Sequence, residues 1–306
     1  MKKILVIHYS QSGQLTDIVN TISKPLYGEK IAVTKYKIEM EEEYPFPWTK
    51  PQFFDVFPES FLQKPQRIKP IPSEIVNTKF DLVILGCQVW YLSPSIPVNS
   101  FLKTSDAKKI LKNTPVVTVI GCRNMWVMAQ EKTKVLLKEC KAQLVGNIAL
   151  VDRHINHISV ITIVQWMFTG EKKNYLKVFP KPGVSQKDID DSSKFGEVIL
   201  EGLNNSNFSN LQSELLKKNA VTIKPFLVLV DKRANVLFGK WANLIHSKGG
   251  PKSKERAVWL KIFNYYLLFA IWMIAPIVFI LFLLTYLPYL RKIKKDKNYY
   301  SSIALK

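Results

Sequence analysis

The sequence has few cysteines and histidines, and this limits the chemistry that it can carry. Among 306 residues there are three cysteines, Cys87, Cys122 and Cys140, and four histidines. Three widely spaced cysteines do not form a disulfide framework, and the histidines have no metal-binding spacing. No cleavable signal precedes the first apolar run, so we expect a cytoplasmic chain whose cysteines are small buried residues.

Two glycine-rich phosphate motifs are also missing. The sequence contains neither GxxxxGK(S/T), which binds the phosphates of ATP, nor GxGxxG, which binds dinucleotides. ATP and an ordinary Rossmann dinucleotide mode are therefore disfavoured.

Acidic residues are few compared with basic ones, 24 against 44, and the formal net charge is +20. Such an excess implies a partner of opposite sign, such as nucleic acid, an anionic membrane or an acidic ligand. The basic residues gather on both sides of an uncharged run, Ile262–Leu290, and no nucleic-acid recognition motif is present. We therefore expect anionic membrane lipid, and no nucleic acid, as a partner.

The uncharged run is long enough to cross a membrane. Its 29 residues would form a helix of about 43 Å, against roughly 30 Å for the hydrocarbon core of a bilayer. Pro276, near the middle, favours a kink or a break. Either one tilted helix spans the bilayer, or a hairpin enters the cytoplasmic leaflet and returns. The basic residues at both ends favour the hairpin. A single span would place one basic cluster on the non-cytoplasmic side, against the tendency of basic residues to stay in the cytoplasm.

Short apolar runs alternate with helical periodicity through the first half of the chain. This pattern predicts an α/β fold with a doubly wound parallel sheet, whose ligands lie beyond the carboxyl ends of the strands. The predicted strands are Lys2–Tyr9, Ile31–Ile38, Phe80–Gly86, Thr114–Gly121 and Gln143–Val151, and the predicted helices include residues 15–26, 98–111, 127–140, 158–167 and 185–203.

Residues 41–75 interrupt this pattern with prolines and aromatics. The segment is too apolar for a solvated loop and too rich in proline for a helix, so we expect an insertion over the surface, either a lid or a packed cover. The expected division is a domain at 1–203, a basic helical extension at 204–261, the membrane segment at 262–290 and a basic tail at 291–306.

A cluster of hydroxyl groups and one glycine follows the first strand. Hydroxyls, a close-approaching backbone and the free N–H groups of the next helix together predict a phosphate site without lysine. Its residues are Ser10, Gln11, Ser12, Gly13, Gln14, Leu15 and Thr16.

This loop resembles the phosphate loop of the flavodoxin family, (S/T)-x-(S/T)-G-x-(S/T), except that Leu15 replaces the last hydroxyl and Thr16 stands one place later. The resemblance implies a flavodoxin-like five-stranded sheet that binds FMN. It assigns two further loops to the flavin, with stacking by the two aromatic residues: Val89, Trp90, Tyr91, Leu92 and Ser93, and then Gly121, Cys122, Arg123 and Asn124.

Two residues are candidates for catalysis. Arg123 is the charged residue of these loops, so it would stabilise an anionic flavin or a substrate oxygen, or else form a surface ion pair. His154 follows the fifth strand, where an imidazole would exchange a proton. His8 is expected to pack beneath the phosphate loop.

The chain also resembles the family of dialkylresorcinol condensing enzymes of flexirubin-type pigment pathways. The resemblance rests on segments that include EYPFPWTKPQFFDVFPES, VWYLSPSIP, TPVVTVIGCRNMW and FPKPGVS. A condensing role needs a nucleophilic cysteine on a thiolase-like fold, which this pattern lacks. We therefore expect an FMN-dependent aromatase that dehydrogenates a lipophilic 2,5-dialkylcyclohexane-1,3-dione, alongside a separate ketosynthase.

Two other functions remain open: an NAD(P)H-dependent quinone or flavin reductase at the membrane, and a tethered electron carrier. Carriers of this fold are acidic and about half this length, so the net charge and the insertion count against the second.

Overall fold

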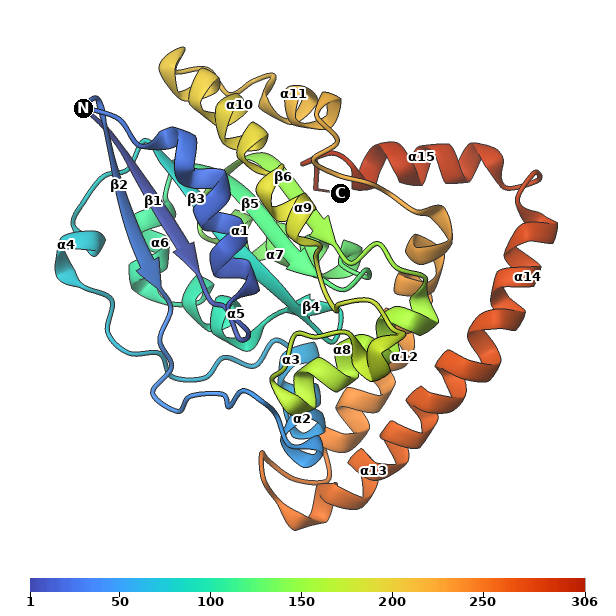
Figure 1. Cartoon of the computed structure of the whole chain (residues 1–306). Helices are drawn as coiled ribbons and strands as arrows, with labels where there is room; N and C mark the ends of the chain where they lie inside the picture. The colour runs from blue at the N-terminus through green and yellow to red at the C-terminus, as the bar shows by residue number, and fades with distance from the viewer. Residues whose placement is uncertain (306) are drawn as a thin grey trace.

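The computed structural model describes residues 1–305 and shows a parallel sheet with helices on both faces (Figure 1). Within these residues the strand order is β2-β1-β3-β5-β6, with a short strand, β4, paired antiparallel to β3. This is the order of flavodoxin-like doubly wound sheets, so the predicted fold class is confirmed. The strands are β1 Lys2–His8, β2 Ile31–Lys37, β3 Leu82–Trp90, β4 Ser93–Pro94, β5 Pro115–Cys122 and β6 Gln143–Val151.

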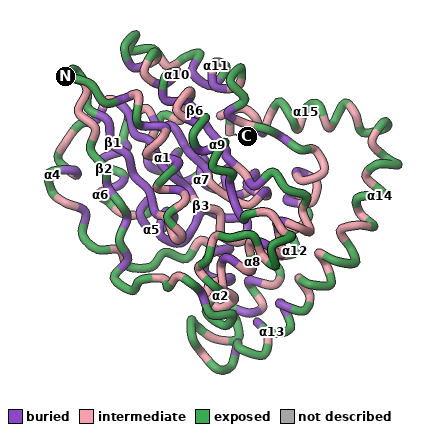
Figure 2. The backbone as a smooth tube through the Cα atoms, in the orientation of Figure 1, coloured by how far each residue is buried: buried purple, intermediate pink, exposed green. Residues whose placement is uncertain are grey.

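The central strands are buried on both faces, as their continuous apolar sequences indicated. In β1, Leu5 and Ile7 pack toward one layer of helices, whereas Ile4 and Val6 pack toward the other. Figure 2 shows these strands as buried over most of their length. Two cores therefore sandwich the sheet. Because β1, β3 and β5 pair in parallel, their carboxyl ends lie at the same end of the sheet.

One layer consists of α1 and the three helices between residues 185 and 217, and the other consists of α5, α6 and α7 with parts of the C-terminal region. The helices and helical turns up to residue 217 are α1 Gln14–Ser23, η1 Lys24–Leu26, α2 Lys50–Asp55, α3 Phe57–Phe61, α4 Ser73–Val76, α5 Ile96–Leu102, α6 Ser105–Leu111, α7 Val127–Glu139, α8 Asn156–Thr169, η2 Tyr175–Lys177, α9 Gln186–Asp190, α10 Ser193–Asn204 and α11 Leu211–Lys217.

Two predicted helices are each divided in two. The helix expected over residues 98–111 is interrupted because the Thr104 hydroxyl accepts a hydrogen bond from Ala107 N–H at 3.0 Å and starts a new helix there. The helix expected over 185–203 is interrupted between Asp190 and Ser193.

The insertion contains helices, contrary to the expectation from its proline content. Pro51 and Pro58 lie in the first turns of α2 and α3, where a missing N–H costs no helical hydrogen bond. These helices pack against α12 (Pro225–His246) and α13 (Lys254–Phe269). Phe57 stacks on Phe263 with ring centroids 3.9 Å apart. The insertion is therefore part of a third apolar cluster.

The C-terminal region does not form a hairpin that turns at Pro276. A helical segment of 32 residues, Lys254–Thr285, passes through this position with a π-helical turn just before it. Within residues 1–305 it is the one helix long and apolar enough to cross a membrane. The elements are α12 Pro225–His246, α13 Lys254–Phe269, the π-turn Ala270–Ile274, α14 Ala275–Thr285 and α15 Leu290–Tyr300. Residue 306, the end of the expected tail, lies outside the described residues.

Candidate functional site

The loop between β1 and α1 presents unpaired backbone donors. Gly13 has φ +85°, and a Cβ atom placed there would meet no atom within 4 Å, so the approach to the loop is open. Within residues 1–305 the N–H groups of Ser12, Gly13 and Gln14 have no hydrogen-bond partner. Free N–H groups at the start of a helix, together with its dipole, attract an anion. The predicted phosphate loop thus has the backbone geometry of an anion site.

The hydroxyls of this loop are not all directed to a ligand. Ser10 Oγ accepts hydrogen bonds from Leu15 N–H and Thr16 N–H, at 3.2 and 3.4 Å. Thr16 Oγ1 lies 3.0 Å from His8 Nε2, and Leu15 is buried in the core. Ser12 is the half-exposed hydroxyl beside the free N–H groups.

His8 lies beneath the loop as an uncharged support. Burial, and next the positive charges of Lys37 and Lys35, lower its pKa from 6.5 to about 4. The imidazole is therefore neutral at neutral pH and adds no charge to the site.

The loop after β3 divides into two halves. Gln88 Oε1 accepts a hydrogen bond from Gln11 N–H at 3.2 Å, and Val89 and Trp90 are half-buried beside it. The Trp90 ring makes edge contacts with the rings of Tyr9, Tyr44 and Trp48, with centroids 6.0, 5.1 and 5.6 Å apart. This first half lies at the carboxyl edge of the sheet with the phosphate loop.

The second half has other partners. The Tyr91 hydroxyl donates to the carbonyl oxygen of Phe53, and the Tyr91 ring packs between insertion aromatics. Leu92 is buried in the third apolar cluster, and the buried Ser93 hydroxyl bonds Lys132 Nζ at 2.7 Å. Of the two aromatic residues, Trp90 therefore lies beside the phosphate loop, whereas Tyr91 packs with the insertion.

The insertion crosses the site. The Gln11 amide donates to the carbonyl oxygens of Tyr44 and Pro45, and Trp48 N–H donates to Met167 O of α8 at 2.9 Å. Residues 44–48 thus join the phosphate loop, the Trp90 ring and α8. This segment covers the edge of the sheet.

The loop after β5 has an oriented guanidinium group. Asn156 Oδ1 accepts hydrogen bonds from Arg123 Nη1 at 3.0 Å and from Asn124 Nδ2 at 2.8 Å. Burial lowers the pKa of Arg123 to about 10, so it keeps its charge at neutral pH. Asn124 Oδ1 is buried without a partner in the described chain. Gly121 brings β5 against α1, because a Cβ there would lie 3.1 Å from Leu15.

The cysteines are unsuited to nucleophilic chemistry. Burial raises the pKa of the Cys87 thiol to about 12 and that of Cys140 to about 11. The pKa of Cys122, in the β5 loop, is also raised by burial. All three thiols therefore stay protonated at neutral pH.

His154 lies on the surface. Its backbone N–H donates to Asp152 Oδ1 at 2.9 Å, and its side chain is exposed. The structure brings Arg123 and Asn124 together through Asn156, but it gives His154 no shared partner with them.

Lys172 lies beside α1, and the sequence did not identify it as a site residue. The negative charge of Asp17 and the positive charge of Lys181 both act on Lys172, whose pKa is lowered mainly by burial. The Gln14 side chain bonds both the N–H and the carbonyl of Val184, which holds this lysine-bearing loop against the start of α1. The FPKPGVS segment, which contains Lys181 and Val184, is the one sequence signal for this part of the site.

A cavity of about 1040 Å³ adjoins this edge. Tyr44 and Trp48 line it and also contact Trp90, so they form a wall between the cavity and the β3 loop. On its other side lie Leu260 and Tyr265 of α13.

The sequence matches no family model and no curated protein. A flavoprotein in complex with FMN from Lactobacillus acidophilus NCFM is 16% identical and covers 49% of this chain and 93% of its own, with a TM-score of 0.38. A flavodoxin from the domain Archaea is 13% identical and covers 66% and 99%, with a TM-score of 0.36. A flavone reductase is 10% identical and covers 67% and 64%, with a TM-score of 0.35. With TM-scores this low, the assignment of the fold rests on the strand order.

Proposed function

We propose that this chain is an FMN-dependent oxidoreductase that works at a membrane. The observation that carries the proposal is the set of free N–H groups of Ser12, Gly13 and Gln14 at the start of α1, on an open approach. A doubly wound sheet binds its ligand outside the carboxyl ends of its strands, at the switch in strand order, which here is the end formed by the loops after β1, β3 and β5.

The residues present fit the cofactor. The N–H groups and the Ser12 hydroxyl would hold the phosphate, and Lys172 would add a positive charge. Trp90 offers a half-buried aromatic surface, and Asn124 Oδ1 offers an unpaired buried acceptor. These groups would hold the flavin ring.

We further propose that the substrate is a 2,5-dialkylcyclohexane-1,3-dione, which loses two hydrogens to become a dialkylresorcinol. Bound FMN would supply the two-electron acceptor. Arg123, fixed by Asn156 and charged at neutral pH, would stabilise the substrate oxygen as the adjacent C–H proton leaves. The exposed His154 would accept this C–H proton.

The apolar helix beside the cavity supports this choice of substrate. Alkyl chains partition into lipid, and the cavity beside Trp90 is bounded by α13 of the apolar helix. We propose that the chain lies on the cytoplasmic face of the inner membrane, on anionic lipid, where it would accept the product of a ketosynthase.

Two experiments test the proposal with the full chain in detergent. First, titration with FMN should give a yellow protein and quenched flavin fluorescence, and a chain that takes up no FMN contradicts every version of it. Second, anaerobic mixing of the loaded protein with the dione should bleach the flavin and yield the resorcinol. Bleaching by NAD(P)H and return of the yellow colour on addition of a quinone, with no bleaching by the dione, would support a quinone reductase instead.

A further inference from the structure

The long apolar helix is attached to the domain at its first turn. Arg256 of α13 is fully buried, and its guanidinium bonds Asp55 at 2.8 Å and Glu59 at 2.8 Å, both in the insertion. Its Nη2 also donates to the carbonyl oxygen of Asp55 at 2.6 Å. A buried guanidinium with several partners fixes this end of the helix to the insertion.

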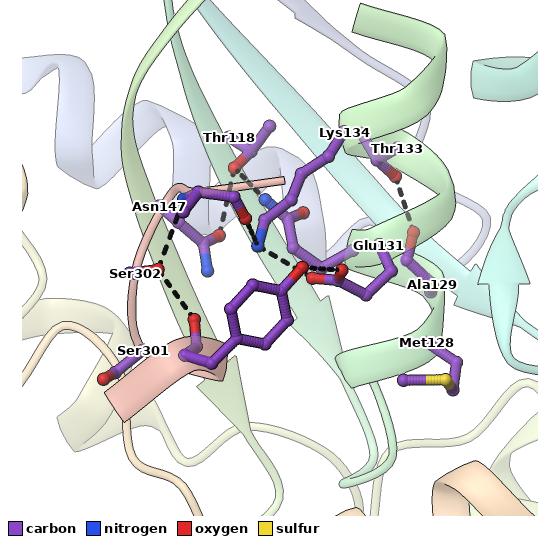
Figure 3. Close-up of polar contacts among 12 residues, drawn as sticks. Thr118, Met128, Ala129, Glu131, Thr133, Lys134, Asn147, Ser301 and Ser302 are labelled. Carbon is purple, nitrogen blue, oxygen red and sulfur yellow. Dashed lines mark hydrogen bonds and ion pairs between the residues drawn. The ribbon is translucent and has the colours of Figure 1, made fainter. Parts of the chain in front are cut away.

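The chain beyond the apolar helix returns to the same domain. Figure 1 shows α15 running back from the end of α14 toward β6. The Tyr299 hydroxyl donates to Glu131 Oε2, Tyr300 is buried in the core, and Lys134 Nζ donates to Ala304 O at 2.8 Å. Figure 3 shows Lys134 and Glu131 beside the segment that carries Ser301 and Ser302. The second end is therefore also held by the domain.

The middle of the helix is held as well. Phe226 of α12 contacts the rings of Phe279 and Phe282, with centroids 4.9 and 5.6 Å apart. His157 Nε2 lies 3.1 Å from the carbonyl oxygen of Ile271. In the π-turn, Ala275 N–H donates to Ala270 O, and the next donor in that register would be Pro276, which has no N–H. His157 supplies the donor that Pro276 cannot.

We propose that Lys254–Thr285 is a membrane anchor that lies along one leaflet, with both of its ends on the side of the sheet domain. A helix of 32 residues is about 48 Å long, so its ends can reach two separate parts of the same domain. A transmembrane course would carry residues 286–305 across the bilayer and remove every contact of Tyr299, Tyr300 and Ala304 with the domain. The inference rests on the membrane association proposed above and does not depend on FMN.

The occupant of this surface is an anionic leaflet. No residue of α14 is buried, and Figure 2 shows the helix as exposed and intermediate along its length. Its side chains are almost all apolar, with Leu284 73% and Ile280 57% exposed. A helix of this kind sinks below the headgroups, where every backbone carbonyl needs a hydrogen-bond donor. At the π-turn, His157 supplies this donor to the carbonyl oxygen of Ile271. Basic residues lie at both ends, at the depth of anionic headgroups: Lys248, Lys252, Lys254 and Lys261, and then Arg291, Lys292, Lys294, Lys295 and Lys297.

Sidedness is the first test. Single cysteines are placed at two exposed sites, Asn205→Cys on the domain and Asn298→Cys after the apolar helix, in sealed membrane vesicles of known orientation. A membrane-impermeant maleimide should label both from the same side, with the wild type as the blank for its native cysteines. Labelling from opposite sides overturns the proposal.

Depth is the second test. Spin labels at Leu268→Cys, Ile277→Cys and Leu284→Cys are compared in vesicles of phosphatidylethanolamine and phosphatidylglycerol by their collisions with oxygen and with a water-soluble nickel complex. We expect similar depths below one surface, whereas a spanning helix would put residue 277 more than about 10 Å deeper than the other two. Failure of the wild type to bind these vesicles would instead refute the membrane association itself.

Discussion

The side-chain amide of Gln11, in the phosphate loop, donates a hydrogen bond to the carbonyl oxygen of Tyr44, in the insertion, at 3.1 Å. The same amide reaches the carbonyl of Pro45. These bonds hold the cover to the loop that it crosses. We therefore expect the 44–48 segment to slow the release of a ligand from this loop.

The Gln11→Ala variant should release FMN faster. Losing the two hydrogen bonds removes about 1 kcal/mol of the free energy that holds the 44–48 segment against the loop, which corresponds to roughly fivefold faster dissociation of FMN. Stopped-flow flavin fluorescence measures the rate, with the exposed Gln186→Ala of α9 as the matched control. An unchanged rate in Gln11→Ala would show that the insertion does not cover the cofactor.

Trp90 and Tyr91 should differ although they are neighbours. Trp90→Leu removes the half-buried ring at the sheet edge and should weaken FMN binding about tenfold. Tyr91→Phe removes only the bond to Phe53 O and should change binding by less than about twofold. Equilibrium titration of both variants decides the assignment, and equal losses would contradict it.

The strands could be predicted because strands buried on both faces leave uninterrupted apolar runs, as at Ile4–Ile7. The phosphate loop could also be predicted, since its hydroxyls and Gly13 are adjacent in sequence. Helix ends were harder to predict. The break before Ser105 depends on one Thr104 cap within an otherwise helical pattern.

The partners of the site residues could not be predicted, because they come from distant parts of the chain. Nothing near Arg123 in the sequence indicates that Asn156 orients it, and nothing near Gln11 indicates Tyr44. Likewise, the apolar run carries no sign that the residues after it return to the domain. Such contacts depend on tertiary packing.

Lys172 should contribute to FMN affinity through its charge. Lys172→Ala removes a cation near the start of α1 and should weaken FMN binding about five- to tenfold at low salt. The difference from wild type should shrink as salt screens the interaction. Lys187→Ala, an exposed lysine of α9, is the control, and equal effects of the two variants would assign the loss to net charge alone.

Arg256 should be essential for holding α13 to the insertion. Arg256→Met leaves Asp55 and Glu59 without their cation and should lower the free energy of unfolding by about 3–5 kcal/mol. Lys254→Met, at an exposed position two residues earlier, should change it by about 0.5 kcal/mol or less. Urea denaturation of the full chain in detergent compares them. Similar stabilities would show that the buried ion pairs do not fix the helix.

His8 should make the fold sensitive to mild acid. Its pKa is about 4 in the folded chain against an ordinary value of 6.5, so the unfolded state takes up a proton first as the pH falls. The stabilisation is complete above about pH 6.5 and is lost as the pH falls toward 4, with a loss of about 2 kcal/mol by pH 5.

The buried carboxyl of Asp231 acts in the opposite direction, so the His8 contribution is measured as a difference between variants. Burial raises the pKa of Asp231 from 3.8 to about 7, despite hydrogen bonds from the N–H groups of Met128 and Val127. The folded state therefore binds the proton first there, and acidification from pH 7 to 5 stabilises the fold.

His8→Gln keeps a hydrogen-bonding group near Thr16 but has no titration in this range. Urea denaturation at pH 7 and pH 5 should show that wild type loses about 2 kcal/mol more than His8→Gln. Equal losses would mean that the pKa of His8 is not lowered in the folded chain, and His8 would then take up a proton beneath the loop as readily as in the unfolded chain.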